Sequence, residues 1–191
     1  MFNSSCLLVE MKRMCPKIVA LTGSPGTGKS TLAAQLERKG VQVVTVEAAA
    51  QQVDALIQHE GSQEIETSKL EAWTWPGSET CVIDGHLSHY CSIDAIIVLR
   101  CNPSKLRQRL SKREGYGPEK IESNVEWELL AGVWSELIVL HPKAKVLEIN
   151  TTNQEIQIES ILGFLANPDV AESVENSIED SIDWISNGIT A

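Results

Sequence analysis

The chain has 191 residues, of which 42% are hydrophobic and 22% are charged, and this composition excludes a collagen, a coiled coil and a wholly disordered chain. No apolar run approaches the ~20 residues of a membrane helix and the start has no signal-peptide layout, so we expect a cytoplasmic protein that does not enter a membrane. The formal net charge of −10 disfavours direct DNA binding.

The first part of the chain predicts a strand, a loop and a helix after an N-terminal extension over residues 1–16. The apolar run Lys17–Thr22 predicts a strand that is buried on both faces. A loop rich in Gly and Pro, Gly23–Ser30, leads into a predicted helix over Lys29–Lys39, and Gly40 then provides a stop signal.

The middle of the chain predicts three further strands. They cover Val41–Val46, Cys81–Ile83 and Ala95–Leu99. The pattern of Glu47–His59 is typical of a helix, and residues 60–79 are expected to be irregular because they hold a Pro-Gly turn.

The last part predicts three helices and a fifth strand. Asn102 and Pro103 form a helix start, with Asn as the cap. A Gly-Tyr-Gly-Pro break then precedes one long helix over Pro118–Leu140, with Trp127 and Trp134 expected in the core. The final elements are a strand at Val146–Ile149, a helix from Thr151 or Thr152 to about Asn167, and an acidic tail.

Strands that alternate with helices imply a parallel sheet covered on both faces, which is an α/β fold. Ligands of such sheets bind at the carboxyl ends of the strands. The loops after Thr22, Ile83 and Leu99 are therefore the expected functional loops.

The loop Gly23-Ser24-Pro25-Gly26-Thr27-Gly28-Lys29-Ser30 matches the P-loop pattern without a mismatch. Its glycines let backbone N–H groups turn toward a phosphate, and the following helix adds its positive end. Lys29 would reach the β- and γ-phosphates, Ser30 would hold Mg²⁺, and Thr31 can add a hydroxyl. The loop and its context predict a nucleotide-binding protein.

Asp84 ends an apolar strand, where a P-loop protein places a second ligand for Mg²⁺. The alternative is a simple turn residue. His86 follows two residues later and is either a hydrogen-bonded core residue or a group that orients water.

Seven of the 16 Lys and Arg residues lie between Arg100 and Lys120, which indicates a discrete anion site. Arg109 and Arg113 share one helical face before the Gly115-Tyr116 break, a layout like the hinged lid of a nucleoside monophosphate kinase. The alternative is a solvated helix face.

Four motifs together resemble the atypical adenylate kinase family (the isoenzyme-six type, with archaeal members). They are Gly23-Ser24-Pro25-Gly26-Thr27-Gly28-Lys29-Ser30-Thr31, Val82-Ile83-Asp84-Gly85-His86-Leu87-Ser88-His89, Ile97-Val98-Leu99-Arg100, and a run from Arg109 through Gly115-Tyr116 to Asn124. The resemblance covers residues 17–165.

The resemblance implies a P-loop nucleoside monophosphate kinase-like three-layer fold with a five-stranded parallel sheet. It implies a kinase domain over residues 17–166, with a monophosphate-binding region at about 41–79 and a lid at about 110–122, followed by the acidic tail 167–191. ATP and Mg²⁺ would be bound, and AMP would be the phosphoryl acceptor in the reaction ATP + AMP = 2 ADP. A role in small ribosomal subunit maturation, with a basic ribosomal protein as partner, is also implied.

The resemblance also implies residue roles. Gly26, Gly28, Lys29, Ser30 and Thr31 would bind ATP. Arg113 would be the lid arginine on ATP, and Asp84 and His86 would form the family's Asp-x-His pair. Together with the motif analysis above, this gives Ser30 and Asp84 as the expected metal ligands, and Lys29, Asp84, His86 and Arg109 as the expected catalytic residues.

Two departures leave the acceptor open. Glu114 is an extra residue that shifts the lid register, and Lys69 is the single Lys or Arg of residues 40–99. Since a monophosphate needs charge-assisted donors, AMP is either held by Arg109 or Arg100 or bound poorly. The alternative function is a P-loop ATPase assembly factor, whose hydrolysis gates release of a basic ribosomal protein.

The acidic end of the chain has two interpretations. Residues 146–191 carry nine Asp and Glu and no Lys or Arg. They serve either for solubility or for docking onto a basic partner. Both interpretations treat residues 168–191 as dispensable for catalysis.

Overall fold

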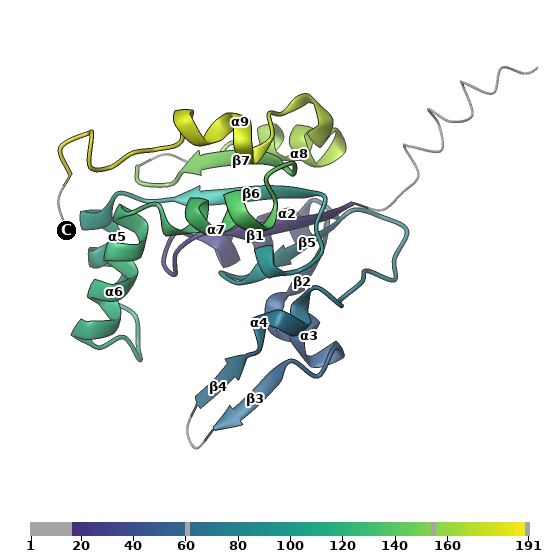
Figure 1. The fold of residues 1–191 in the computed structure, drawn as a ribbon, viewed down its shortest axis with the longest axis horizontal. Coiled ribbons are helices and arrows are strands. Elements are labelled where there is room, and N and C mark those ends of the chain that lie inside the picture. Colours follow the sequence, from purple (N-terminus) through teal and green to yellow (C-terminus); the bar gives the residue numbers. More distant parts are fainter. Residues whose placement is uncertain (1–16, 60–61, 154–155, 190–191) are drawn as a thin grey trace, which may run out of the picture.

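The computed structural model describes residues 17–59, 62–153 and 156–189, which form a five-stranded parallel sheet with helices on both faces (Figure 1). The strand order is β2-β5-β1-β6-β7, from Gln42–Thr45, Cys81–Asp84, Ile18–Thr22, Ala95–Arg100 and Lys145–Asn150. This confirms the predicted α/β fold. The predicted extension 1–16 lies outside the described residues.

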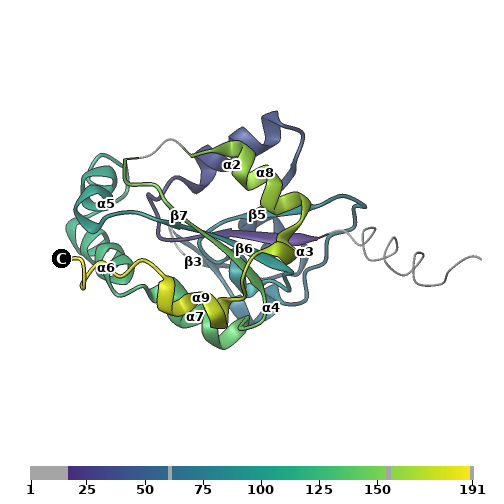
Figure 2. The same ribbon diagram turned by 90° about the horizontal axis from the view of Figure 1, so that it is seen from above.

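One face of the sheet is covered by α2 (Lys29–Arg38) and α8 (Ile158–Ala166), which lie on the same side in Figure 2. Their apolar side chains pack on β1, β5 and β6 and form one core cluster, which includes Leu32, Leu36, Ile161, Phe164, Val19, Leu21, Val82 and Ile97. Burial of this face anchors the helix that follows the P-loop.

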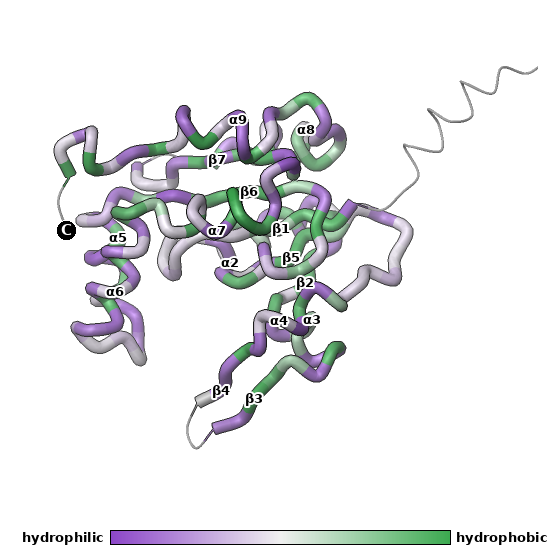
Figure 3. The backbone as a smooth tube through the Cα atoms, viewed as in Figure 1, coloured by the Kyte–Doolittle hydropathy of each residue, from purple (hydrophilic) through white to green (hydrophobic). Residues whose placement is uncertain are grey.

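The opposite face is covered in two parts. Helices α7 (Gly132–Leu140) and α9 (Val174–Ser177) pack on β6 and β7, and Trp134 is buried there as predicted. Helices α3 (Val46–Gln52) and α4 (Thr67–Leu70) pack on β5 with the fully buried Trp73. In Figure 3 the green, hydrophobic colour runs through the central part of the sheet and through α7, whereas β7 carries both green and purple stretches.

Two further units project from the sheet (Figure 1). An antiparallel hairpin is formed by β3 (Leu56–His59) and β4 (Ser62–Ile65). Helices α5 (Pro103–Leu110) and α6 (Pro118–Leu129) lie beyond the carboxyl ends of β6 and β7, and the short 3₁₀ helices are Ser88–Tyr90, Pro168–Val170 and Ile178–Asp180. Asn102 caps α5 as predicted, since its Oδ1 accepts from the Ser104 and Lys105 amides.

The predicted helix over Glu47–His59 is wrong after Gln52. Asp54 adopts a left-handed φ of 52°, and the Ala55 amide donates to the Ala50 carbonyl at 2.8 Å. This is the hydrogen-bond pattern of a left-handed helix stop, which Asp tolerates better than most residues. The chain then forms β3 within the predicted helix and β4 in a region that was expected to be irregular.

The predicted long helix over Pro118–Leu140 is two helices, because Ala131 adopts a left-handed φ of 50° between α6 and α7. Gly132 packs against the indole of Trp127 at a distance that leaves no room for a Cβ atom. Trp127 is 41% exposed, so its predicted place in the core is wrong. The last helix also begins later than predicted, at Ile158.

The C-terminal segment, expected as an acidic tail, packs against the body. The Val146 amide donates to the Glu172 carbonyl at 3.1 Å, and the Val174 amide donates to the Ala144 carbonyl at 3.0 Å. Val174 is fully buried and Trp184 is 6% exposed. This segment is therefore part of the folded unit. Within the described residues, no helix is long and apolar enough to cross a membrane.

Truncating Trp184 should destabilise the fold. Trp184→Ala is expected to lower the free energy of unfolding by about 3–5 kcal/mol, because it leaves a cavity in a buried site. Ile185→Ala is the matched control, since Ile185 is 55% exposed and its truncation should cost about 0.5 kcal/mol or less. Urea unfolding measures both, and equal small losses would contradict the packed segment.

Candidate active site

The P-loop follows β1, the central strand of the sheet. The strands β2 and β5 lie on one side of β1, and β6 and β7 lie on the other, so the loop lies where ligands of such sheets bind. Gly23 has a φ of 131° and lies against the Leu99 carbonyl with no room for a Cβ atom. Gly28 has a φ of 103° and precedes the first residue of α2. Only glycine adopts both conformations without strain, so the loop geometry follows from these residues.

Lys29 is held on the P-loop itself. Its Nζ donates to the Gly23 carbonyl at 2.7 Å and to the Ser24 carbonyl at 3.0 Å. Burial lowers the pKa of the Lys29 ammonium to about 8, and the nearby Asp84 carboxylate opposes that shift. The ammonium is thus poised next to the loop, with its charge weakly solvated.

Asp84 ends β5 beside the loop, and its Oδ1 has no hydrogen-bond partner among the described residues. Burial raises the pKa of Asp84, while the Ser30 hydroxyl and the Lys29 charge act in the opposite direction. An unpartnered buried carboxylate oxygen near a serine hydroxyl fits a hard cation such as Mg²⁺, which prefers oxygen ligands. Ser30 and Asp84 are thus suited to hold that ion.

One cavity of about 780 Å³, here called the phosphate cavity, brings most of the predicted site together. Its lining includes all of the predicted ATP and metal ligands and two of the catalytic candidates besides Lys29, namely Gly26, Gly28, Lys29, Ser30, Thr31, Arg113, Asp84 and His86. It also includes residues that the motifs did not assign: Thr45, Glu47, Tyr116, Lys120 and Asn124. Thr45 is the last residue of β2 and Glu47 follows it closely, so their place at the carboxyl end of a strand is the signal that could have found them.

Two cations from the predicted lid face this cavity around one tyrosine. The Arg113 guanidinium lies 5.3 Å from the Tyr116 ring centroid, and the Lys120 ammonium lies 4.4 Å from it. Both distances fit cation–π contacts, which hold the charges near the loop without neutralising them. The cavity therefore presents Lys29, Arg113 and Lys120 to an anion.

His86 is mainly neutral at pH 7. Burial lowers the pKa of its imidazole, and the Lys29 charge lowers it further. A neutral imidazole has one nitrogen that accepts a hydrogen bond, so it can orient a water molecule.

Arg109 lies on the other side of the P-loop, in a separate cavity of about 530 Å³, here called the base cavity, which also holds Thr31, Gln35 and Ile156. Its Nη2 donates to the Thr151 carbonyl at 2.7 Å, and its Nη1 donates to the Gly26 carbonyl at 3.3 Å. The structure thus separates Arg109 from the phosphate cavity, where Arg113 lies. The two arginines were expected to act together.

Arg100 is fully buried and does not reach any cavity of the described residues. Its Nε donates to Glu128 at 2.7 Å and its Nη1 donates to Glu148 at 3.0 Å. The expectation that Arg100 grips a monophosphate is therefore wrong, because both carboxylates already use its charge.

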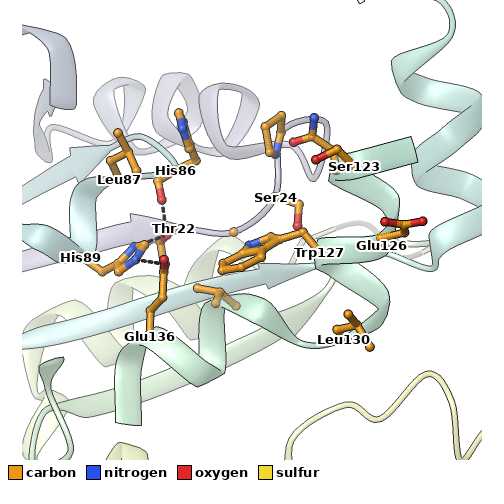
Figure 4. Close-up of a pocket in the computed structure, with 14 residues that line it drawn as sticks. Thr22, Ser24, His86, Leu87, His89, Ser123, Glu126, Trp127, Leu130 and Glu136 are labelled. Carbon is orange, nitrogen blue, oxygen red and sulfur yellow. Dashed lines mark hydrogen bonds and ion pairs between the residues drawn. The ribbon is translucent and has the colours of Figure 1, made fainter. Parts of the chain in front are cut away.

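A third cavity, of about 480 Å³, adjoins the loop on the side of α6 and α7 (Figure 4). The indole of Trp127 lies beside Ser24, and His89 lies across the cavity. The His89 ring is held by two hydrogen bonds, one between its Nδ1 and the Thr22 hydroxyl at 2.9 Å and one between its Nε2 and the Glu136 carboxylate at 2.7 Å. His86 lines both this cavity and the phosphate cavity, so it lies between the two.

Comparisons with known proteins show the family to which the chain belongs. A family model described as an AAA domain matches residues 19–131. A protein of Methanocaldococcus jannaschii named "Putative adenylate kinase" is 32% identical over 176 residues, which are 87% of this chain and 96% of that protein. A protein of Archaeoglobus fulgidus with the same name is 36% identical over 173 residues, 88% of this chain and 92% of that protein.

Among solved structures, a deoxyadenosine kinase from M. mycoides matches with a TM-score of 0.51 and 17% identity, over 78% of this chain and 97% of that one. The sheet order and the loop after β1 define a P-loop protein with a nucleoside monophosphate kinase-like fold. The chain belongs to the family of the archaeal proteins named above, which confirms the resemblance seen in its motifs.

ATP affinity should depend on the charge of Lys29. Because the pKa of the unliganded ammonium is about 8, affinity is expected to fall by up to tenfold per pH unit above that value, as long as bound phosphate keeps Lys29 protonated. Calorimetric titration between about pH 7.5 and 9.5 measures this effect. Lys29→Arg keeps its charge and should show a flat profile. A flat profile for the native chain would contradict the lowered pKa.

Proposed function

We propose that this protein is a nucleoside monophosphate kinase that transfers the γ-phosphate of ATP to AMP. The observation that carries the proposal is the phosphate cavity, in which Lys29, the unpartnered Asp84 oxygen and the lid cation Arg113 surround one volume. Membership of a family whose members are named as adenylate kinases supports the choice of AMP.

ATP would lie along the P-loop. Its triphosphate would take the loop amides and Lys29, since both are arranged for a phosphate before any ligand binds. Its base would lie in the base cavity, beside Arg109 and Gln35. On this arrangement Arg109 acts on nucleotide binding rather than on the transferred group.

Ser30 and Asp84 would hold Mg²⁺, which when bound supplies positive charge to the phosphate oxygens. The chain's own contribution is the positioning of the phosphates and the neutralisation of their charge. An AMP phosphate oxygen is already anionic, so the reaction needs no general base.

The acceptor phosphate would be held by the lid. The candidate Lys69 is paired with Glu66 at 2.7 Å and donates to the Asp54 carbonyl at 3.3 Å, so it is already engaged. Arg113 and Lys120 remain at the phosphate cavity and would supply the charge-assisted donors.

Substitutions of Arg113 and Arg109 should therefore affect different kinetic constants. Arg113→Ala is expected to lower kcat by about 100-fold, because it removes a cation from the reacting phosphates. Arg109→Ala is expected to raise the KM for ATP by about tenfold with a small change in kcat, because it removes a uniform binding contact. Steady-state rates of ADP formation measure both. A large loss of kcat in Arg109→Ala would contradict this assignment.

A second candidate function is ATP hydrolysis coupled to release of a basic ribosomal protein during small-subunit maturation. It is favoured by the neutral His86 at the phosphate cavity and by the scarcity of free cations on the acceptor side. Exposed acidic residues of the C-terminal segment, Glu179, Asp180 and Asp183, would suit a basic partner.

One assay tests both functions. Purified protein is mixed with ATP, Mg²⁺ and AMP, and ADP and free phosphate are followed together. Formation of ADP without free phosphate, and only with AMP present, supports the kinase. Free phosphate that is independent of AMP supports the ATPase.

His86→Gln should discriminate further. It is expected to lower hydrolysis by about tenfold or more, because a positioned base is lost, and to leave AMP phosphorylation within about threefold. His59→Gln is the matched control, since His59 lies on the β3–β4 hairpin away from the cavities. Equal losses of both reactions in His86→Gln would remove the role in orienting water.

A further inference from the structure

Glu128, on α6, connects three parts of the molecule from a site that is 1% exposed. Its Oε2 accepts a hydrogen bond from the Ser24 hydroxyl at 2.7 Å. Its Oε1 accepts from Arg100 Nε at 2.7 Å, and also from the Cys101 amide and Trp184 Nε1, both at 3.1 Å. One buried carboxylate thus joins the P-loop, the end of β6 and the C-terminal segment.

On the P-loop side, Ser24 is the residue whose position Glu128 fixes. Ser24 is 1% exposed, and its carbonyl accepts from Lys29 Nζ at 3.0 Å and from the Thr27 hydroxyl at 2.8 Å. A shift of Ser24 would therefore move the carbonyl on which the Lys29 ammonium rests. Glu128 itself lines none of the three cavities described above.

On the other side, the C-terminal segment closes the network from solvent. The Ile182 amide donates to Glu148 at 2.9 Å, and Arg100 donates to the Ile182 carbonyl at 3.2 Å. The Trp184 ring centroid lies 5.9 Å from the Arg100 guanidinium carbon. A buried ion pair needs such complete hydrogen bonding, because unpaired charges in the interior are costly.

We infer that Glu128 is a positioning residue of the active site, and that Trp184 holds it in place from the C-terminal segment. Glu128 fixes the Ser24 hydroxyl, Ser24 fixes the resting place of Lys29, and the loop is thereby arranged before phosphate binds. This inference rests on the proposed function only for its readout in kcat, because the loop also binds ATP without turnover.

The chain supplies a matched control. Glu148 also pairs with Arg100 and also holds the C-terminal segment, yet it does not contact the P-loop. Glu128→Gln and Glu148→Gln therefore both remove a buried charge from Arg100. Only the first one reverses the hydrogen bond at Ser24, since an amide nitrogen in place of Oε2 is a donor.

The experiment is a double-mutant cycle between Ser24→Ala and Glu128→Gln, with Glu148→Gln as control. Each single variant of the first pair is expected to lower kcat by about tenfold, and the double variant by about the same factor, because both act on the same contact between Ser24 and Glu128. Glu148→Gln is expected to lower the thermal midpoint, to leave kcat within about twofold, and to combine multiplicatively with Ser24→Ala.

A kcat loss that multiplies between Ser24→Ala and Glu128→Gln would overturn the inference. So would an equal kcat loss in Glu148→Gln, because that result would show a general effect of the ion pair. If Glu128→Gln does not fold, Trp184→Phe replaces it, since it keeps a smaller aromatic ring in the buried site and removes the N–H donor to Glu128. The inference then requires that the double variant Trp184→Phe with Ser24→Ala loses no more kcat than Ser24→Ala alone.

ATP affinity, measured by equilibrium binding without AMP, separates this inference from the proposed function. If the native chain binds ATP but does not phosphorylate AMP, the proposed function fails and the cycle is read on affinity. Shared losses of affinity would then support the positioning role, and multiplied losses would overturn it.

Discussion

The buried ion pair between Arg100 and Glu128 is the constraint on which the rest of the structure depends. Two charges in the interior cost more free energy than their attraction returns unless further hydrogen bonds complete them. Arg100 donates to Glu128, Glu148 and the carbonyls of Glu128 and Ile182, so α6, β7 and the C-terminal segment must all be in place around it. The same pair brings the carboxylate of Glu128 to the P-loop. The nucleotide site and the packing of the C-terminal segment therefore depend on the same ion pair.

The basic residues between Arg100 and Lys120 have different partners and therefore different roles. Arg100 pairs with carboxylates in the interior, and Arg107 forms a bidentate pair with Glu122. Arg109 donates to the carbonyls of Gly26 in the P-loop and of Thr151, just after β7. The two cations of this region that line the phosphate cavity are Arg113 and Lys120. These basic residues therefore fall into three groups: those that pair with carboxylates, those that hold the P-loop and those that face an anion site. The side-chain partners of each residue determine its group.

Much of the fold follows from local sequence, because the signals concerned are local. The P-loop glycines, the Asn102 cap and the apolar strands each determine their own backbone, and the structure confirms them. The errors have a different origin. Trp127 and Arg100 were misplaced because their burial depends on distant partners, namely Gly132 beyond a helix break and Glu148 on another strand. Glu128 was overlooked for the same reason, since its place on a helical face does not reveal that it meets Ser24.

The C-terminal segment shows why composition alone misleads. Residues 146–191 have nine carboxylates and no Lys or Arg, and this composition predicts a free acidic arm. However, Lys17 and Lys143 from the body pair with Asp169 and Glu175, and Trp184 supplies the apolar contact that holds the segment. Once Trp184 is docked, the unpaired charge is displayed on a fixed surface, and the same segment supports the loop through Glu128. A basic partner that bound this surface would act on a segment hydrogen-bonded, through two side chains, to the residue on which Lys29 rests. Electrostatic recognition and nucleotide chemistry would then share one physical connection.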